Sequence, residues 1–246
     1  MDSPNHILNR IGAGPDFTES YGPLEDQIID FYNFKANTDK VIVLLHGGFW
    51  KPEYDRTHLR TLAFALSKDG HRVALLEYRR SPGEPDVSTR DVKEALKHLQ
   101  QMPNSENSRL ILVGHSAGGH LALWAAVNSD YVSGVMALAP VCNFLGGDAI
   151  DLGEGAIRDF LGEDPLGRPD LDPMQITRPT CPTVIIHGID DTLPIDLTRR
   201  YMETEESLNA GIKFIEYPGI GHFELIDPEE PFYESMLEEL DTSFEC

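Results

Sequence analysis

Short runs of β-branched and aliphatic residues alternate along this chain with segments of helical periodicity. Apolar residues recur at i, i+3, i+4 and i+7 from Leu59 to Leu66 and again from Val92 to Leu99, which is the pattern of an amphipathic helix. A strand without a polar side must be covered on both faces, so the alternation predicts an α/β fold with a mostly parallel central sheet. The candidate buried strands are Val41–Leu45, Val73–Tyr78, Leu110–Val113, Gly134–Ala139, Thr183–His187 and Lys213–Tyr217.

Weaker signals predict three further features, namely strands in the N-terminal region and the starts of two helices. The N-terminal region reads as a hairpin or edge strands around Phe17–Tyr21 and Gln27–Phe34. Ser88-Thr89-Arg90-Asp91 resembles a capping box and predicts the start of the second helix. Asp227-Pro228 is expected to open the last helix, because proline is tolerated in a first turn.

The segment from Asn143 to Arg178, after the sixth strand, departs from this alternation. It is acidic and rich in Gly and Pro, with one short helix expected near Ala156–Leu161. We expect an excursion over the carboxyl edge of the sheet, where open α/β sheets bind ligands, and hence a partial lid. A solvated connection is the alternative. With 246 residues, the chain is expected to form a single domain over residues 1–246.

The charge balance restricts the partners of the chain. It carries 41 Asp and Glu against 20 Lys and Arg, a net charge of −21. This argues against nucleic acid and anionic lipid as partners, since both are bound through basic residues. The three cysteines form no Cys-x-x-Cys pair, and neither a signal peptide nor an apolar run of about 20 residues is found. We expect a soluble, cytoplasmic monomer or homodimer that acts on a small molecule.

A Gly-x-Ser-x-Gly sequence follows the third buried strand. Gly114-His115-Ser116-Ala117-Gly118-Gly119 lies between Leu110–Val113 and the apolar helical run Leu121–Val127. Between a strand and a helix, this motif holds its serine in a strained, exposed turn. The helix N-terminus adds partial positive charge and free N–H groups beside the serine. Ser116 is therefore the candidate nucleophile, against the alternative of a tight structural turn.

A serine nucleophile needs a base and an acid that orients the base. His222 lies in a Gly-flanked loop after the strand Lys213–Tyr217, at the same sheet edge as Ser116. The acid should follow the preceding strand, where Asp190 and Asp191 compete. Counting from Gly188 favours Asp191 and counting back from Pro194 favours Asp190. Because the strand end should fix the register better, we predict Asp191.

His46-Gly47-Gly48-Phe49-Trp50 follows the first buried strand and is the candidate oxyanion loop. We expect backbone N–H donors from Ala117 and from Gly48 or Phe49 to face the developing charge. His46 is expected to brace this loop, and structural roles are also expected for His187 and His115. Trp50 is a candidate substrate-binding residue, and Tyr54 or Phe144 could also hold an aryl group.

Together these residues resemble the α/β-hydrolase fold family over nearly the whole chain, from about Val41 to Leu240. The oxyanion-loop sequence looks like the His-Gly-Gly-x-Trp motif of kynurenine formamidases, and the Ser116 turn is also similar to that group. Both motifs recur in small bacterial carboxylesterases. The resemblance implies a cofactor-free catalytic triad of Ser116, Asp191 and His222. The Asp-to-Pro loop departs from the usual spacing.

The first hypothesis is a serine hydrolase that cleaves a small carboxylic ester or aryl formamide through an acyl-enzyme. A general short-acyl carboxylesterase is the alternative within this class. A catalytically inactive hydrolase fold serving as a binding module is the alternative from another class. The nine histidines show no metal-ligand spacing such as His-Glu-x-x-His, and no Gly-x-Gly-x-x-Gly sequence follows the first strand. No metal or cofactor is therefore expected.

Overall fold

A single twisted sheet organises the structure, a computed structural model that describes residues 7–8, 10, 12–103, 105 and 107–245. The described residues form eight strands in the order β1-β2-β4-β3-β5-β6-β7-β8. β1 pairs antiparallel with β2 and β2 with β4, while the other neighbours are parallel. The strands are β1 (Phe17–Ser20), β2 (Ile28–Tyr32), β3 (Lys40–Leu45), β4 (Arg72–Leu76), β5 (Arg109–His115), β6 (Val132–Leu138), β7 (Thr183–Gly188) and β8 (Lys213–Tyr217).

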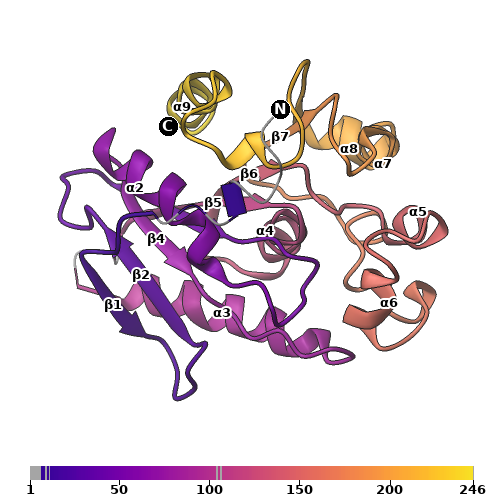
Figure 1. Cartoon of the computed structure of the whole chain (residues 1–246), viewed down its shortest axis with the longest axis horizontal. Coiled ribbons are helices and arrows are strands. Elements are labelled where there is room, and N and C mark those ends of the chain that lie inside the picture. Colours follow the sequence, from indigo (N-terminus) through magenta and orange to yellow (C-terminus); the bar gives the residue numbers. More distant parts are fainter. Residues whose placement is uncertain (1–6, 9, 11, 104, 106, 246) are drawn as a thin grey trace.

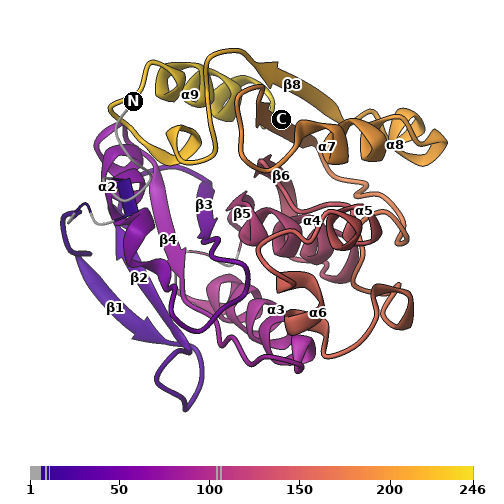
Figure 2. The same ribbon diagram turned by 45° about the vertical axis from the view of Figure 1, so that its right-hand side comes forward.

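Helices cover both faces of the sheet, which confirms the predicted α/β-hydrolase architecture. α2 and α9 lie on one face, and α3, α4 and α7 lie on the other (Figure 2). The helices are α2 (Arg60–Lys68), α3 (Pro85–Gln101), α4 (Ala117–Asn128), α5 (Phe144–Ala149), α6 (Ala156–Leu161), α7 (Ile195–Met202), α8 (Glu205–Ala210) and α9 (Phe232–Thr242). Short 3₁₀ helices are η1 (Arg56–Leu59), η2 (Pro165–Gly167) and η3 (Glu224–Ile226).

The centre of the sheet is apolar on both sides, as the sequence runs predict. Residues Val41–Leu45 of β3 are all buried, and so are residues Leu110–His115 of β5. α4 is apolar on most of its circumference because it packs between β5, β6 and α3. The N-terminal hairpin is also confirmed, with β1 as the edge strand.

Two helix starts differ from the sequence prediction. α3 begins at Pro85 rather than near Ser88, because proline suits the first position of a helix. Asp91 then bonds Gln27 and Arg79 instead of capping the helix. α9 begins at Phe232, not at Asp227-Pro228; Asp227 instead accepts bonds from the Glu229 N–H and the Arg10 guanidinium.

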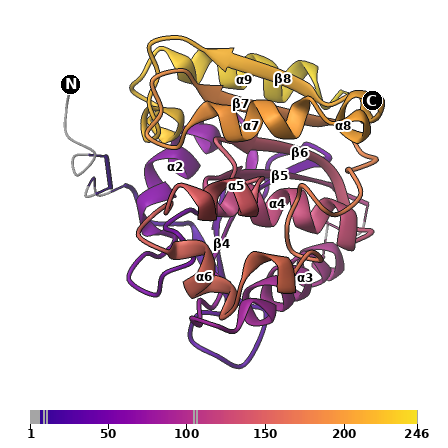
Figure 3. The ribbon, with the colours of Figure 1, turned by 90° about the vertical axis from the view of Figure 1, so that its right-hand side faces the viewer.

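The excursion over residues 143–178 contains two short helices, α5 and α6, of which α6 has the predicted bounds. It lies beside the sheet on the same side of the view as α7 (Figure 1). Figure 3 shows it in front of α4, next to the carboxyl ends of the central strands. Among the described residues, no helix is long and apolar enough to cross a membrane.

Candidate active site

Ser116 occupies a strained turn between β5 and α4. Its φ of 56° and ψ of −118° lie in a region that residues with a side chain rarely adopt. Hydrogen bonds to both sides hold this geometry: Ser116 N–H donates to Leu138 O (2.9 Å), and Ser116 O accepts from His120 N–H (3.1 Å). Strain of this kind persists only where the surroundings impose it, which is typical of functional residues.

Glycines beside Ser116 allow backbones to approach closely. A Cβ atom on Gly114 would lie 2.3 Å from Gly118 O, and one on Gly118 would lie 2.1 Å from Leu45 O. A Cβ atom on Gly47 would lie 3.0 Å from the Ser116 Cβ. The three strand and loop segments therefore meet at Ser116 only because these positions lack side chains.

His222 and Asp191 lie next to one another at the same sheet edge. Both carboxylate oxygens of Asp191 are 2.9 Å from His222 Nδ1. The Asp191 side chain is fully buried, and its Oδ1 also accepts the Leu193 N–H at 2.6 Å. Asp190 is exposed instead. The structure thus brings Asp191, and not Asp190, to the histidine.

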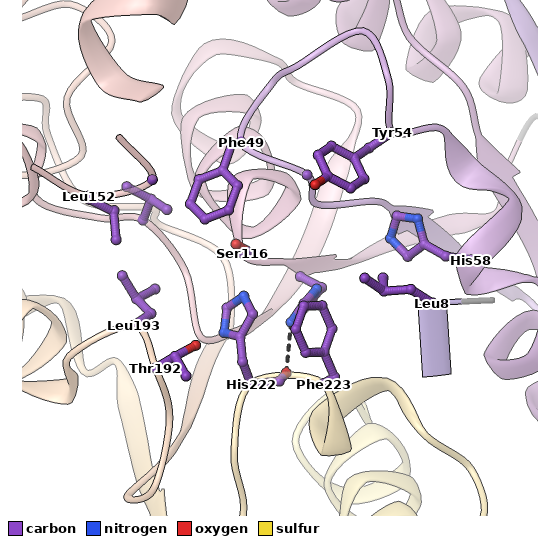
Figure 4. Close-up of a pocket in the computed structure, with 14 residues that line it drawn as sticks. Leu8, Phe49, Tyr54, His58, Ser116, Leu152, Thr192, Leu193, His222 and Phe223 are labelled. Carbon is purple, nitrogen blue, oxygen red and sulfur yellow. Dashed lines mark hydrogen bonds between the residues drawn. The ribbon is translucent and has the colours of Figure 1, made fainter. Parts of the chain in front are cut away.

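The Ser116 hydroxyl points into a cavity on the side where the His222 ring lies (Figure 4). The His222 side chain is 10% exposed. This arrangement leaves Nε2 as the ring nitrogen that can exchange a proton with a nucleophile, because Nδ1 is engaged by Asp191. The three residues predicted as a triad are therefore adjacent in space, although they come from three separate loops.

Two further histidines support the loops that carry the triad. His115 Nε2 donates to the His222 carbonyl oxygen at 2.9 Å, so the nucleophile strand holds the His222 loop. Burial lowers the pKa of His115 well below its ordinary value, and the neighbouring His222 adds to this effect, so His115 stays neutral. His187 bonds Thr198 Oγ1 (2.8 Å) and Leu193 O (2.9 Å). Both therefore hold the backbone, as expected.

The oxyanion loop has three successive residues in the left-handed region: Gly48 (φ 107°), Phe49 (54°) and Trp50 (55°). A buried polar network braces it from below. His46 Nδ1 bonds Gly47 O at 2.8 Å, and His46 Nε2 lies 3.1 Å from Glu77 Oε1. Ala117 is the first residue of α4, so its N–H belongs to a turn that lacks helical acceptors.

Burial acts to raise the pKa of Glu77, but the hydrogen bond and charge of His46 and the charge of Arg80 outweigh it. The pKa of Glu77 is therefore held well below its ordinary value, and the group is a carboxylate beneath the loop. Tyr78 adds a bond from its hydroxyl to His46 O at 2.7 Å. This network explains how the chain sustains a strained loop beside Ser116.

Trp50 does not lie where the sequence prediction placed it. The prediction of a substrate-binding role is corrected, because Trp50 is 2% exposed and is not among the residues lining the cavity that contains Ser116. Its ring stacks on Phe160 at 4.4 Å and meets Phe144 edge-on at 5.7 Å. The left-handed backbone turns Trp50 into the core and leaves Phe49 at the cavity. Phe144 is likewise fully buried.

The cavity beside Ser116 has a volume of about 260 Å³. Besides Ser116 and His222, several residues from other loops line it; Tyr54 was anticipated from the sequence, and Leu8, His58 and Phe223 were not. No periodic pattern marked these positions. The lining residues are Leu8, Gly48, Phe49, Tyr54, His58, His115, Ser116, Val141, Leu152, Gly153, Thr192, Leu193, His222 and Phe223.

The excursion reaches the cavity through Leu152 and Gly153. Phe49 packs against Gly153, because a Cβ atom there would lie 2.6 Å from the Phe49 ring. Lys51 Nζ adds a bond to the Gly153 carbonyl oxygen at 3.3 Å. The excursion therefore contacts the oxyanion loop directly and forms part of the cavity wall. Among the described residues, no group of three or more His, Cys, Asp or Glu side chains could hold a metal ion.

This fold and this strand–serine–helix turn are those of the α/β hydrolases, and the chain belongs to the alpha/beta hydrolase family, which matches residues 42–175. It is 24% identical to a kynurenine formamidase of Drosophila melanogaster, over 87% of this chain and 79% of that protein. It is 25% identical to a probable isoprenylcysteine alpha-carbonyl methylesterase of Arabidopsis thaliana, over 90% of this chain. The chain spans about half (54%) of the length of that protein.

Among solved structures, the fold resembles esterase B of Lactobacillus rhamnosis, with a TM-score of 0.76 at 20% identity. That superposition covers 94% of this chain and 86% of the esterase. A truncated carbohydrate esterase from gut microbiota is similar, with a TM-score of 0.75 at 20% identity, over 94% of this chain and 99% of that one. These structures share the α/β-hydrolase fold of this chain.

Proposed function

We propose that this protein is a serine hydrolase that cleaves small carboxylic esters or aryl formamides through an acyl-enzyme. The observation that carries the proposal is the meeting of Ser116 and His222 at one small cavity, with the Asp191 carboxylate 2.9 Å from His222 Nδ1. A serine, a base and an acid that orients the base constitute the machinery of acyl transfer.

In the proposed reaction, Ser116 Oγ attacks the substrate carbonyl carbon while His222 Nε2 takes the hydroxyl proton. The negative charge on the carbonyl oxygen is stabilised by the N–H groups of Ala117 and of Gly48 or Phe49. When the tetrahedral intermediate collapses, the bond to the leaving group breaks, and His222 returns the proton to the leaving oxygen or nitrogen. A water molecule, deprotonated by His222, then attacks the acyl carbon; the bond to Ser116 Oγ breaks, His222 returns the proton to Ser116 Oγ, and the acid is released.

Asp191 supports each of these steps through His222. Its carboxylate fixes the tautomer in which Nδ1 carries the hydrogen, so that Nε2 presents a lone pair to Ser116. It also stabilises the positive charge of the ring after proton transfer. Both carboxylate oxygens are close to Nδ1, and the bond from Leu193 N–H holds the carboxylate in place.

The size and lining of the cavity support a small substrate. Its volume of about 260 Å³ lies just below the range of typical drug-sized ligand pockets. The kynurenine formamidases among the relatives support an aryl formamide. Aliphatic side chains in the wall, namely Val141, Leu152 and Leu193, favour the second candidate, a short-acyl carboxylesterase, since a formyl group would leave them without contacts.

The test compares kcat/KM for N-formylkynurenine and for p-nitrophenyl acetate on one preparation, with Ser116→Ala as the control. Hydrolysis that is lost in Ser116→Ala supports the proposal, and the preferred substrate decides between formamidase and carboxylesterase. Full activity in Ser116→Ala would refute the mechanism. If neither substrate is hydrolysed and a fluorophosphonate does not label Ser116, the protein is a binding module instead of a hydrolase.

A further inference from the structure

His58 is a buried histidine in the wall of the cavity that the proposed triad does not use. It belongs to η1 and is 9% exposed. In Figure 4 its ring lies at one end of the cavity, between Tyr54 and Leu8, with Phe223 nearby. Leu152 and Leu193 lie at the opposite end, beyond Ser116. One end of the cavity is therefore largely aromatic, and the other is aliphatic.

The His58 ring is neutral at neutral pH. Burial lowers its pKa to about 4, and the neighbouring His46 acts in the same direction. A neutral imidazole carries its hydrogen on one ring nitrogen only, so the other nitrogen is an acceptor with a free lone pair.

Among the residues that the structure describes, no side chain hydrogen-bonds to the His58 ring. The ring meets that of His46 edge-on at 5.8 Å, a contact that a phenyl ring would make equally well. Because His58 lines the cavity, a ligand bound there can donate a hydrogen bond to the ring.

We propose that the end of the cavity formed by Leu8, Tyr54, His58 and Phe223 binds an aromatic leaving group that carries a hydroxyl or N–H, with His58 accepting its hydrogen bond. A planar aryl group suits the aromatic side chains at this end, and the donor satisfies the free nitrogen. His58 is thus a specificity-determining residue. This inference rests on the proposed hydrolase function and deepens it by naming the class of leaving group.

The kinetic test uses two aryl acetates, 3-hydroxyphenyl acetate and 3-methoxyphenyl acetate. Their meta substituents withdraw electrons to nearly the same extent, but only the hydroxyl can donate a hydrogen bond. We expect wild-type kcat/KM to favour the hydroxyl substrate by about fivefold, the size of one hydrogen bond. His58→Phe should abolish this preference, and His58→Gln, whose amide oxygen can accept, should retain part of it.

Leu152→Ala is the matched control at the opposite end of the cavity. It is expected to change the rates for both substrates by the same factor, so that their ratio stays at the wild-type value. The proposal is overturned if the ratio is near one in the wild type, or if His58→Phe leaves it unchanged. It is also overturned if Leu152→Ala, rather than His58→Phe, removes the preference.

A binding measurement keeps the inference separate from the proposed activity. In the Ser116→Ala protein, resorcinol should shift the imidazole NMR signals of His58 and bind about fivefold more tightly than 1,3-dimethoxybenzene. If the wild type hydrolyses neither acetate but resorcinol is preferred, the proposed function fails and the donor site stands. Equal binding of the two compounds, or binding that does not shift His58, refutes the site. Thermal unfolding of His58→Phe and His58→Gln shows whether each variant is folded.

Discussion

Replacing Asp191 with asparagine tests the candidate triad at its acid. The Leu193 N–H donates to Asp191 Oδ1 at 2.6 Å. The asparagine side chain would therefore use its amide oxygen to accept the same hydrogen bond from Leu193 N–H. Its NH₂ group would then face His222 Nδ1. That nitrogen would have to accept a hydrogen bond, which moves the ring hydrogen to Nε2. His222 could no longer take the proton of Ser116.

The size of the expected rate loss follows from the distance between Asp191 and His222 and from the burial of the Asp191 side chain. At 2.9 Å, and with an effective dielectric constant of about 20, the carboxylate stabilises a cationic imidazole by about 6 kcal/mol. Since about 1.36 kcal/mol corresponds to a tenfold change in rate, the loss amounts to about 10⁴-fold. This agrees with the drop of about 10⁴ expected when a triad aspartate becomes asparagine. We therefore expect kcat/KM for p-nitrophenyl acetate to fall by about 10⁴.

Asp190→Asn is the matched control, because it makes the same chemical change one residue earlier on an exposed side chain. We expect its kcat/KM to stay within about twofold of wild type, since a surface charge away from the reacting atoms contributes little. Circular dichroism during heating establishes that both variants are folded. The reasoning is refuted if folded Asp191→Asn keeps more than about a tenth of the activity, or if Asp190→Asn loses as much as Asp191→Asn.

Three further predictions concern the stability of the fold. Gly118→Ala would place a Cβ atom 2.1 Å from Leu45 O; urea unfolding should show a loss of at least about 1–3 kcal/mol, and a change below about 0.5 kcal/mol would contradict the close approach. Glu77→Gln leaves Arg80 without its buried carboxylate and should cost about 3–5 kcal/mol. Because the pKa of Glu77 is held below its ordinary 4.5, the wild type should also lose stability as the pH falls below that value, and the variant should lack this component. Burial lowers the pKa of His120 from 6.5 to about 4. The stability that the neutral, buried ring contributes is therefore complete above pH 6.5 and is lost as the pH falls toward 4. That loss is about 3 kcal/mol; it should be absent in His120→Phe, and an NMR titration midpoint near 6.5 in the native protein would contradict it.

The nucleophile turn could be predicted because its requirements are local. A buried strand, a serine between small residues and an apolar helix occur within about fifteen residues, and the parallel sheet directs their junction to one edge. Asp191 could be chosen over Asp190 by counting from the strand end. β7 ends at Gly188, and Ile189 N–H still donates to Tyr217 O at 2.9 Å, so the register is fixed up to that point.

Trp50 shows where this reasoning fails. Its position in the oxyanion loop suggested a pocket wall, but side-chain direction there depends on backbone dihedral angles that composition does not reveal. Three successive residues with positive φ turn the Trp50 ring toward Phe160 and place Phe49 at the cavity instead. An aromatic pair in such a loop predicts that one member is buried, without showing which.

The residues that form the aromatic end of the cavity could not be predicted from the sequence, for a different reason. Leu8 lines the cavity beside His58, and nearby Arg10 binds both carboxylate oxygens of Asp227, at 2.6 and 3.0 Å, in the loop after His222. This contact joins positions 217 residues apart, and no periodic pattern in the sequence predicts it. The sheet fixes where acyl transfer can occur, whereas irregular segments brought together by tertiary contacts decide what fits beside Ser116. Relatives that share this fold at about 24% identity can therefore share the chemistry and still differ in substrate, and variants at His58 and Leu152 probe the part of the site in which such differences arise.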